Sequence, residues 1–242
     1  MTIGENYLKI RKEIPSYVKI VIATKTRTPN EIKELIEVGA TDIGENYVQE
    51  AEEKKQALKK DLGHKIQWHM IGPLQKNKIN KALPIFDLIQ SVDSIKLARE
   101  IDKRVEKAGK DFIPILLEIN IGSEFTKYGI KPAEHKDFEA YMEELAKDVS
   151  SLSHIRLEGL MTMGPLTGDP EKVRPYFKRV KNIFDNLARL ELERVNMKYL
   201  SMGMTNSYKV AIEEGANLIR IGTAIFGPRK CQIKSDEKTI LD

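Results

Sequence analysis

Short apolar runs alternate with longer stretches of helical period along the whole sequence, and this alternation restricts the fold more than any other feature. The runs are rich in β-branched residues, so they predict strands, and strands that alternate with helices predict parallel βαβ units. The eight expected strands are Lys19–Thr24, Thr41–Gly44, Ile66–Ile71, Phe86–Val92, Phe112–Ile121, Arg156–Met163, Tyr199–Met202 and Leu218–Gly222.

The stretches between the runs carry apolar residues at three- and four-residue steps, as amphipathic helices do. The period is best seen at Val173, Phe177, Val180, Phe184, Leu187 and Leu190, and again at Phe138, Met142, Leu145 and Val149. Eight βα units in 242 residues come close to the ~250 residues typical of the closed form. The sequence therefore predicts a single α/β domain over residues 1–242, a (β/α)8 TIM barrel rather than an open doubly wound sheet. No room is expected for a second domain after Gly227.

Charge and cysteine content exclude several classes of protein. The 40 Lys and Arg interleave with 36 Asp and Glu for a net charge of +4, which argues against a nucleic-acid partner. No apolar run approaches the ~20 residues needed to cross a bilayer, so no membrane association is expected. The single cysteine, Cys231, excludes an intramolecular disulfide and suits a reducing compartment. The N-terminus meets charged residues too early for a signal peptide, so a cytoplasmic location is expected.

Lys25 follows the first expected strand, in the segment KIVIATKTRTP. In parallel α/β folds the chemistry gathers at the C-terminal ends of the strands. A lysine there can lose solvation and act as a nucleophile toward an aldehyde. The competing interpretation is an exposed lysine that opens a loop, and this segment alone favours the loop lysine.

The loops after the last two strands favour a phosphate site. They read SMGMT and GTAIFG, so Gly203 and Gly222 allow the backbone to approach a ligand, while Ser201 and Thr223 add hydroxyl groups. Barrels that bind a phosphate usually do so with the loops after strands seven and eight. Each glycine alone is typical of an ordinary turn, but two in these two loops are more specific.

Arg220 lies inside an apolar strand, Leu218-Ile219-Arg220-Ile221. A buried charge is costly and needs a partner. The sequence leaves two interpretations open: an ion pair within the barrel, or a fixed cation that faces a ring nitrogen or an anion at the mouth.

Other catalytic sites find no support. The four histidines, His64, His69, His135 and His154, show no metal-ligand spacing, which argues against zinc. No nucleophile elbow and no Walker-type phosphate loop occurs.

A nucleophilic lysine, a phosphate cup and an opposing cation together suggest pyridoxal 5′-phosphate (PLP). The sequence resembles the pyridoxal phosphate homeostasis protein family (the YggS/PROSC type), whose fold is similar to the barrel domain of alanine racemase, among the fold type III PLP proteins. Seven blocks carry the resemblance in order along the chain: ATKTRTP at 23–29, GENYVQE at 44–50, WHMIGPLQKNK at 68–78, SEFTKYGI at 123–130, GLMTMG at 159–164, SMGMTNSY at 201–208 and RIGTAIFGPR at 220–229. The departures are Thr205, where a serine is commoner but the hydroxyl is kept, and Pro73.

The resemblance implies a role for individual residues. Lys25 matches the lysine that forms the Schiff base, Arg220 matches the partner of the pyridine nitrogen, and Asn46 lines the pocket. The phosphate cup is implied to be Ser201, Gly222 and Thr223. Lys127 matches a second lysine that is linked to cofactor transfer, with an exposed loop lysine as the simpler alternative.

The expected function is a PLP-binding protein without robust catalysis, which holds the cofactor and maintains its intracellular level. An always-charged arginine beside the pyridine nitrogen disfavours ring protonation and weakens the ring as an electron sink. Racemases of this fold add a second domain across a dimer, whereas this chain is expected to be a monomer. Apo-PLP enzymes are the expected recipients of the cofactor. The alternatives are a PLP-dependent amino-acid racemase or lyase, and an aldolase that uses Lys25 directly.

Overall fold

A computed structural model describes residues 2–59, 66–165 and 167–228 of the chain. His64 and Cys231 lie outside the described residues, as does the last residue of the seventh matching block.

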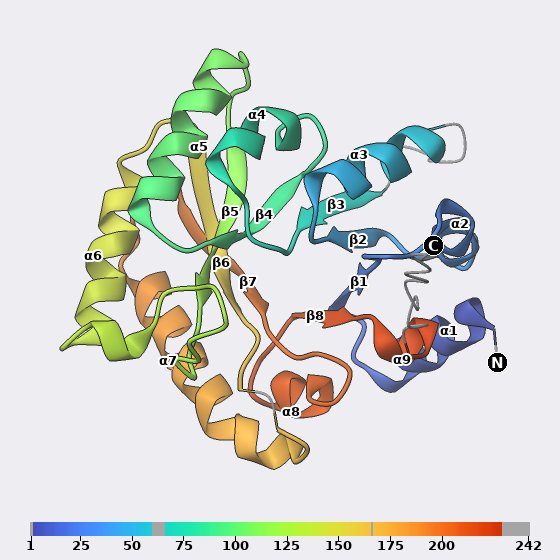
Figure 1. Ribbon diagram of the computed structural model, residues 1–242. Helices are drawn as coiled ribbons and strands as arrows, with labels where there is room; N and C mark the ends of the chain where they lie inside the picture. Colours follow the sequence, from blue (N-terminus) through green and yellow to red (C-terminus); the bar gives the residue numbers. More distant parts are fainter. Residues whose placement is uncertain (1, 60–65, 166, 229–242) are drawn as a thin grey trace, which may run out of the picture.

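Eight parallel strands close into a barrel in which each strand pairs with the next and β8 returns to β1 (Figure 1). This confirms the predicted fold. The strands are β1 (Lys19–Ala23), β2 (Asp42–Glu45), β3 (Gln67–Met70), β4 (Leu88–Val92), β5 (Ile113–Ile119), β6 (Ile155–Thr162), β7 (Val195–Ser201) and β8 (Leu218–Ile221).

Seven of the eight predicted strands agree with the structure to within two residues at each end. The exception is the strand predicted at Tyr199–Met202, which corresponds to β7. β7 begins at Val195 rather than at Tyr199, because its first half is exposed on one side at Asn196 and Lys198. A strand that alternates between polar and apolar residues does not stand out as a continuous apolar run.

Helices surround the barrel (Figure 1). They are α1 (Ile3–Glu13), α2 (Pro29–Glu37), α3 (Val48–Ala57), α4 (Ile79–Ala82), α5 (Ile95–Lys107), α6 (Phe138–Ser150), α7 (Arg174–Arg189), α8 (Tyr208–Glu213) and α9 (Thr223–Phe226), with 3-10 turns at Lys76–Lys78, Pro132–Glu134 and Pro170–Val173. The predicted apolar faces of α6 and α7 are buried against the barrel, apart from Phe184 and Leu190, which are half-buried.

The N-terminal helix α1 supports the end of the barrel at which β8 and β1 meet. It contacts α2 and α9, and the Asn6 side-chain amide donates to the Ile225 carbonyl of α9 at 2.9 Å. The short helix α9 is therefore fixed from outside the barrel, which matters because α9 borders the cavity described below.

The core has two zones with different chemistry. Between the sheet and the helices it is apolar. Inside the barrel, buried polar side chains accompany a small apolar cluster of Leu88, Leu116 and Met161. These polar residues are Asp42, His69, Gln90, Glu118, Ser201 and Arg220. Buried polar groups are costly unless they are hydrogen-bonded, so this interior depends on a satisfied network.

Candidate functional site

A cavity of about 360 Å³ opens at the C-terminal ends of the strands. It brings together five of the six predicted site residues: Lys25, Asn46, Arg220, Gly222 and Thr223. The other lining residues are Ala23, Arg27, Ile71, Met163, Pro165, Thr167, Pro170, Val173, Met204, Thr205, Asn206, Ser207 and Phe226.

The charges that line this cavity all have one sign. Lys25, Arg27 and Arg220 border it, and no described Asp or Glu does. The hydroxyls of Thr205, Ser207 and Thr223 lie among the same residues. Three cations with several hydroxyl groups form a site for an anion such as a phosphate ester.

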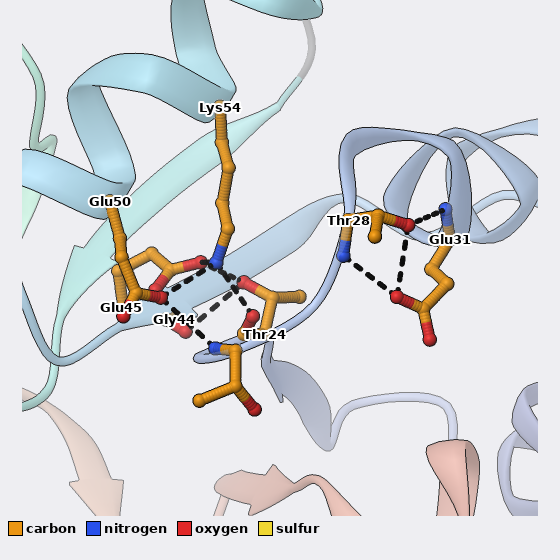
Figure 2. Close-up of polar contacts among 8 residues, drawn as sticks. Thr24, Thr28, Glu31, Gly44, Glu45, Glu50 and Lys54 are labelled. Carbon is orange, nitrogen blue, oxygen red and sulfur yellow. Dashed lines mark hydrogen bonds and ion pairs between the residues drawn. The ribbon is translucent and has the colours of Figure 1, made fainter. Parts of the chain in front are cut away.

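Lys25 is half-buried and lies one residue after the buried Thr24, in the loop between β1 and α2. α2 starts at a capping box in which Thr28 and Glu31 bond each other's backbone N–H groups (Figure 2). A cluster around Lys54 lies on the other side of the loop (Figure 2). The loop that carries Lys25 is therefore fixed from both directions.

Arg220 extends from β8 into the interior of the barrel and is only 5% exposed. Its Nη1 donates to the Ser201 carbonyl at 2.9 Å and to the Ser201 Oγ at 2.6 Å, and its Nη2 donates to the Thr162 carbonyl at 2.8 Å. Burial lowers the pKa of Arg220 to about 10, so the guanidinium remains charged at neutral pH. The groups that hold Arg220 within the barrel are uncharged, so these bonds are not the ion pair that one interpretation expected, and Arg220 also borders the cavity.

A chain of hydrogen bonds runs from Arg220 across the barrel to Asp42. Ser201 Oγ donates to Gln90 Oε1 at 2.7 Å, Gln90 Nε2 lies 3.0 Å from His69 Nδ1, and His69 Nε2 lies 3.0 Å from Asp42 Oδ1. Arginine can only donate and a carboxylate can only accept. The two ends therefore fix the direction of every bond between them and assign the imidazole hydrogen to Nε2.

The carboxylate end of this chain is ionised. Burial opposes the ionisation of Asp42, but the hydrogen bond from His69 and a second one from Thr41 outweigh it and lower the pKa of Asp42 to about 2. Lys19, 3.2 Å away, adds a further positive charge.

One sequence expectation needs correction here. Ser201 was expected in the phosphate cup, but it is fully buried, bonds Gln90 and Arg220, and does not line the cavity. Ser201 is the last residue of β7, and its side chain points into the barrel, where its hydroxyl accepts a hydrogen bond from Arg220. His69 likewise points inward, to Asp42 and Gln90.

Sequence reasoning missed other groups at the site. Thr205 Oγ1 accepts from the Ala224 N–H at 3.2 Å and so joins the loop after β7 to α9. Arg27, two residues after Lys25, lies with its guanidinium carbon 4.7 Å from the Phe226 ring centroid. The sequence feature that could have identified Arg27 is its positive charge in the same short loop as Lys25.

Glu118 was also missed, although it stands in an apolar strand, as Arg220 does. It is 4% exposed, and burial raises its pKa to about 7 against the opposing influence of Arg220. The barrel interior therefore also holds the carboxyl group of Glu118, which keeps its proton in mildly acidic solution.

Lys127 does not border the cavity. It lies in the loop after β5, where its Nζ donates to Glu124 Oε1 and to the Gly164 carbonyl, both at 2.8 Å. Its side chain is 14% exposed, so the simple picture of an exposed loop lysine is wrong. Lys127 ties the loop after β5 to the loop after β6.

Within the described ranges, no group of three or more His, Cys, Asp or Glu residues could hold a metal ion. Among the same residues, no helix is long and apolar enough to cross a membrane.

The fold and the site define a class of protein, the alanine racemase-like barrels. The family model of the alanine racemase N-terminal domain matches residues 2–230. An alanine racemase from Clostridium difficile 630 shares the fold with a TM-score of 0.75 at 16% identity, over 96% of this chain and 58% of that chain.

Relatives with higher sequence identity identify the family within this class. The chain is 42% identical over 212 residues to a pyridoxal phosphate homeostasis protein from Aquifex aeolicus (strain VF5), covering 88% of this chain and 87% of that one. It also matches PipY of Synechococcus elongatus PCC7942, solved with PLP bound, with a TM-score of 0.81 and 31% identity over 93% of this chain and 100% of that chain. This chain belongs to the pyridoxal phosphate homeostasis protein family, which confirms the resemblance seen in its sequence.

Proposed function

We propose that this protein binds pyridoxal 5′-phosphate in the cavity at the barrel mouth, covalently through Lys25, and maintains the intracellular level of the cofactor. The observation that carries the proposal is the cavity itself, which joins a lysine at the end of β1 to two arginines and several hydroxyls with no described carboxylate among its lining residues. The solved relative with PLP bound supports the same choice of ligand.

The residues at the mouth fit the different parts of this cofactor. Thr205, Gly222 and Thr223 lie together in the loops after β7 and β8 and would hold the phosphate. Arg220 would face the pyridine ring, and Asn46 would line its side.

When bound, PLP supplies an aldehyde that condenses reversibly with a lysine amine and releases one water. The chain's own contribution is to present the Lys25 amine to that aldehyde and to hold the phosphate and the ring in place. Arg220 would present a fixed positive charge to the ring, because three hydrogen bonds hold it and it stays charged at neutral pH.

The charge on Arg220 supports a carrier over a racemase or lyase. A guanidinium beside the ring nitrogen disfavours protonation of that nitrogen, and an unprotonated ring withdraws electrons less strongly. The protein would then store PLP and release it to apo-enzymes. We further propose that it acts in the cytoplasm as a monomer.

The test uses purified protein with PLP. Wild-type protein should develop a visible absorption band that Lys25→Ala lacks, and the loaded protein should restore activity to an apo-PLP enzyme. The loaded protein is then incubated with a panel of L-amino acids. Racemisation or elimination at an ordinary enzymatic rate, roughly 1–10³ per second, would replace the carrier by the racemase or lyase. A missing band in the wild type would refute PLP binding at Lys25.

A further inference from the structure

The two peptide groups that flank Lys25 are both held by one buried cluster. The Thr24 carbonyl accepts a hydrogen bond from Lys54 Nζ at 2.8 Å, as Figure 2 shows. The Thr26 N–H donates to Glu50 Oε2 at 3.0 Å. The backbone on either side of Lys25 is thus anchored, while the Lys25 side chain borders the cavity.

Lys54 is the centre of this cluster. It reaches from α3, and its Nζ lies 2.7 Å from Glu45 Oε1 and 3.1 Å from Glu50 Oε2 (Figure 2). The side chains of Lys54 and Glu45 are 7% and 0% exposed. Thr24 Oγ1 donates to the same Glu45 oxygen at 2.5 Å. One ammonium therefore connects two carboxylates and the backbone next to Lys25.

Such a cluster is an expensive way to join α3 to β2. Removing two charges from water is unfavourable, and apolar side chains of similar size often stabilise a fold equally well. The second carboxylate oxygen of Glu45 is buried without a hydrogen-bond partner among the described residues, and burial raises the pKa of Glu45. Stability of the fold alone does not account for these features.

The loop itself is strained at the residue that the cluster holds. Thr26 has a φ of 66°, a left-handed conformation that is unfavourable for a β-branched residue. A residue in this conformation persists only where its surroundings enforce it, and here the Glu50 carboxylate binds its N–H. The strained turn directs the chain from β1 into α2 immediately after Lys25.

We infer that Lys54, together with Glu45 and Glu50, is a positioning cluster that sets the direction in which the Lys25 amine enters the cavity. The inference rests on the proposed function, because it concerns the presentation of Lys25 to an aldehyde. Lys54 touches the backbone beside Lys25 and acts through that residue.

The main test compares a double variant and a single variant that remove ion pairs at opposite ends of the same strands. The double variant Lys54→Met/Glu45→Met removes the buried Lys54–Glu45 ion pair and the bond to the Thr24 carbonyl without leaving an unpaired buried charge, and it keeps Glu50. The control Lys19→Met removes the pair that Lys19 forms with Asp42, 3.2 Å away at the other end of β1 and β2. Three quantities are measured: thermal unfolding without cofactor, the rate at which an amine-selective reagent labels Lys25 in cofactor-free protein, and the PLP concentration that half-loads Lys25, trapped with borohydride and mapped by peptide mass.

The double variant should need at least tenfold more PLP to half-load Lys25, and the labelling rate of Lys25 in cofactor-free protein should change at least threefold. Lys19→Met should leave both quantities within twofold of the wild type even if its melting temperature falls. Glu50→Ala provides a second test in case the double variant does not fold. The Glu50 side chain is 33% exposed, so its removal leaves the core intact. It should raise the half-loading concentration at least threefold.

Unchanged loading and labelling in Glu50→Ala, or in a folded double variant, would overturn the inference, as would an equal loss in Lys19→Met. Wild-type protein that does not load Lys25 at all would refute the proposed function instead, so the two failures are distinguishable.

Discussion

The buried carboxyl of Glu118 should make the stability of this protein fall as the pH rises through the mildly acidic range. Burial raises its pKa from 4.5 to about 7, with Arg220 opposing and Asp93 adding to the shift. Between these two values the folded state keeps a proton that the unfolded chain has released. The stabilisation is therefore complete below about pH 4.5 and is lost by about pH 7. At ~1.36 kcal/mol per pKa unit the loss amounts to about 3 kcal/mol.

Glu118→Gln replaces this carboxyl by a neutral group and should abolish the pH dependence that Glu118 contributes. Urea unfolding of the variant and the wild type at several pH values between 4.5 and 8 measures the difference in their unfolding free energies. That difference should shift by about 3 kcal/mol in favour of the variant as the pH rises. Glu52→Gln, at an exposed position on α3, is the control and should show no such shift. A difference between Glu118→Gln and the wild type that stays constant across this range would refute the argument.

Three further predictions concern the barrel interior. Gly159→Ala should destabilise the fold by at least about 3 kcal/mol, because a Cβ there would lie 1.9 Å from the Tyr199 carbonyl oxygen; a change below ~1 kcal/mol in urea unfolding would contradict this. Asp42→Asn should lower the unfolding free energy by about 2 kcal/mol at pH 5 to 7, and the gap should close as the pH falls through the Asp42 pKa of about 2; a gap that persists at the lowest pH would be the opposite result. Ser201→Ala should cost about 1–3 kcal/mol and speed the dissociation of PLP, because Arg220 loses a hydrogen bond at 2.6 Å; unchanged dissociation in stopped-flow absorbance would show that Ser201 does not position Arg220.

The architecture was predictable because it depends on patterns that are local in the sequence. Apolar periodicity marked the strands and helices, and the rule that active sites lie at the C-terminal ends of barrel strands brought Lys25 and Arg220 to one mouth. β7 was predicted too short because its exposed half resembles a polar loop.

The errors at the site concern the direction of side chains, which depends on residues far away in the sequence. Ser201 and Thr205 stand four positions apart, yet one bonds Gln90 inside the barrel and the other bonds the Ala224 N–H beside the cavity. The motif SMGMT does not reveal which hydroxyl faces which side. Lys54 is likewise an ordinary basic residue in a helix until the fold places it 2.7 Å from Glu45.

The central claim is that Lys25 carries the cofactor, and one measurement tests it directly. The protein is mixed with PLP, reduced with borohydride, digested, and mapped by mass spectrometry. The account predicts that the peptide containing Lys25 bears the reduced cofactor and that Lys25→Ala abolishes it. Stoichiometric modification of another lysine, such as Lys54 or Lys127, with Lys25 left unmodified would contradict the account.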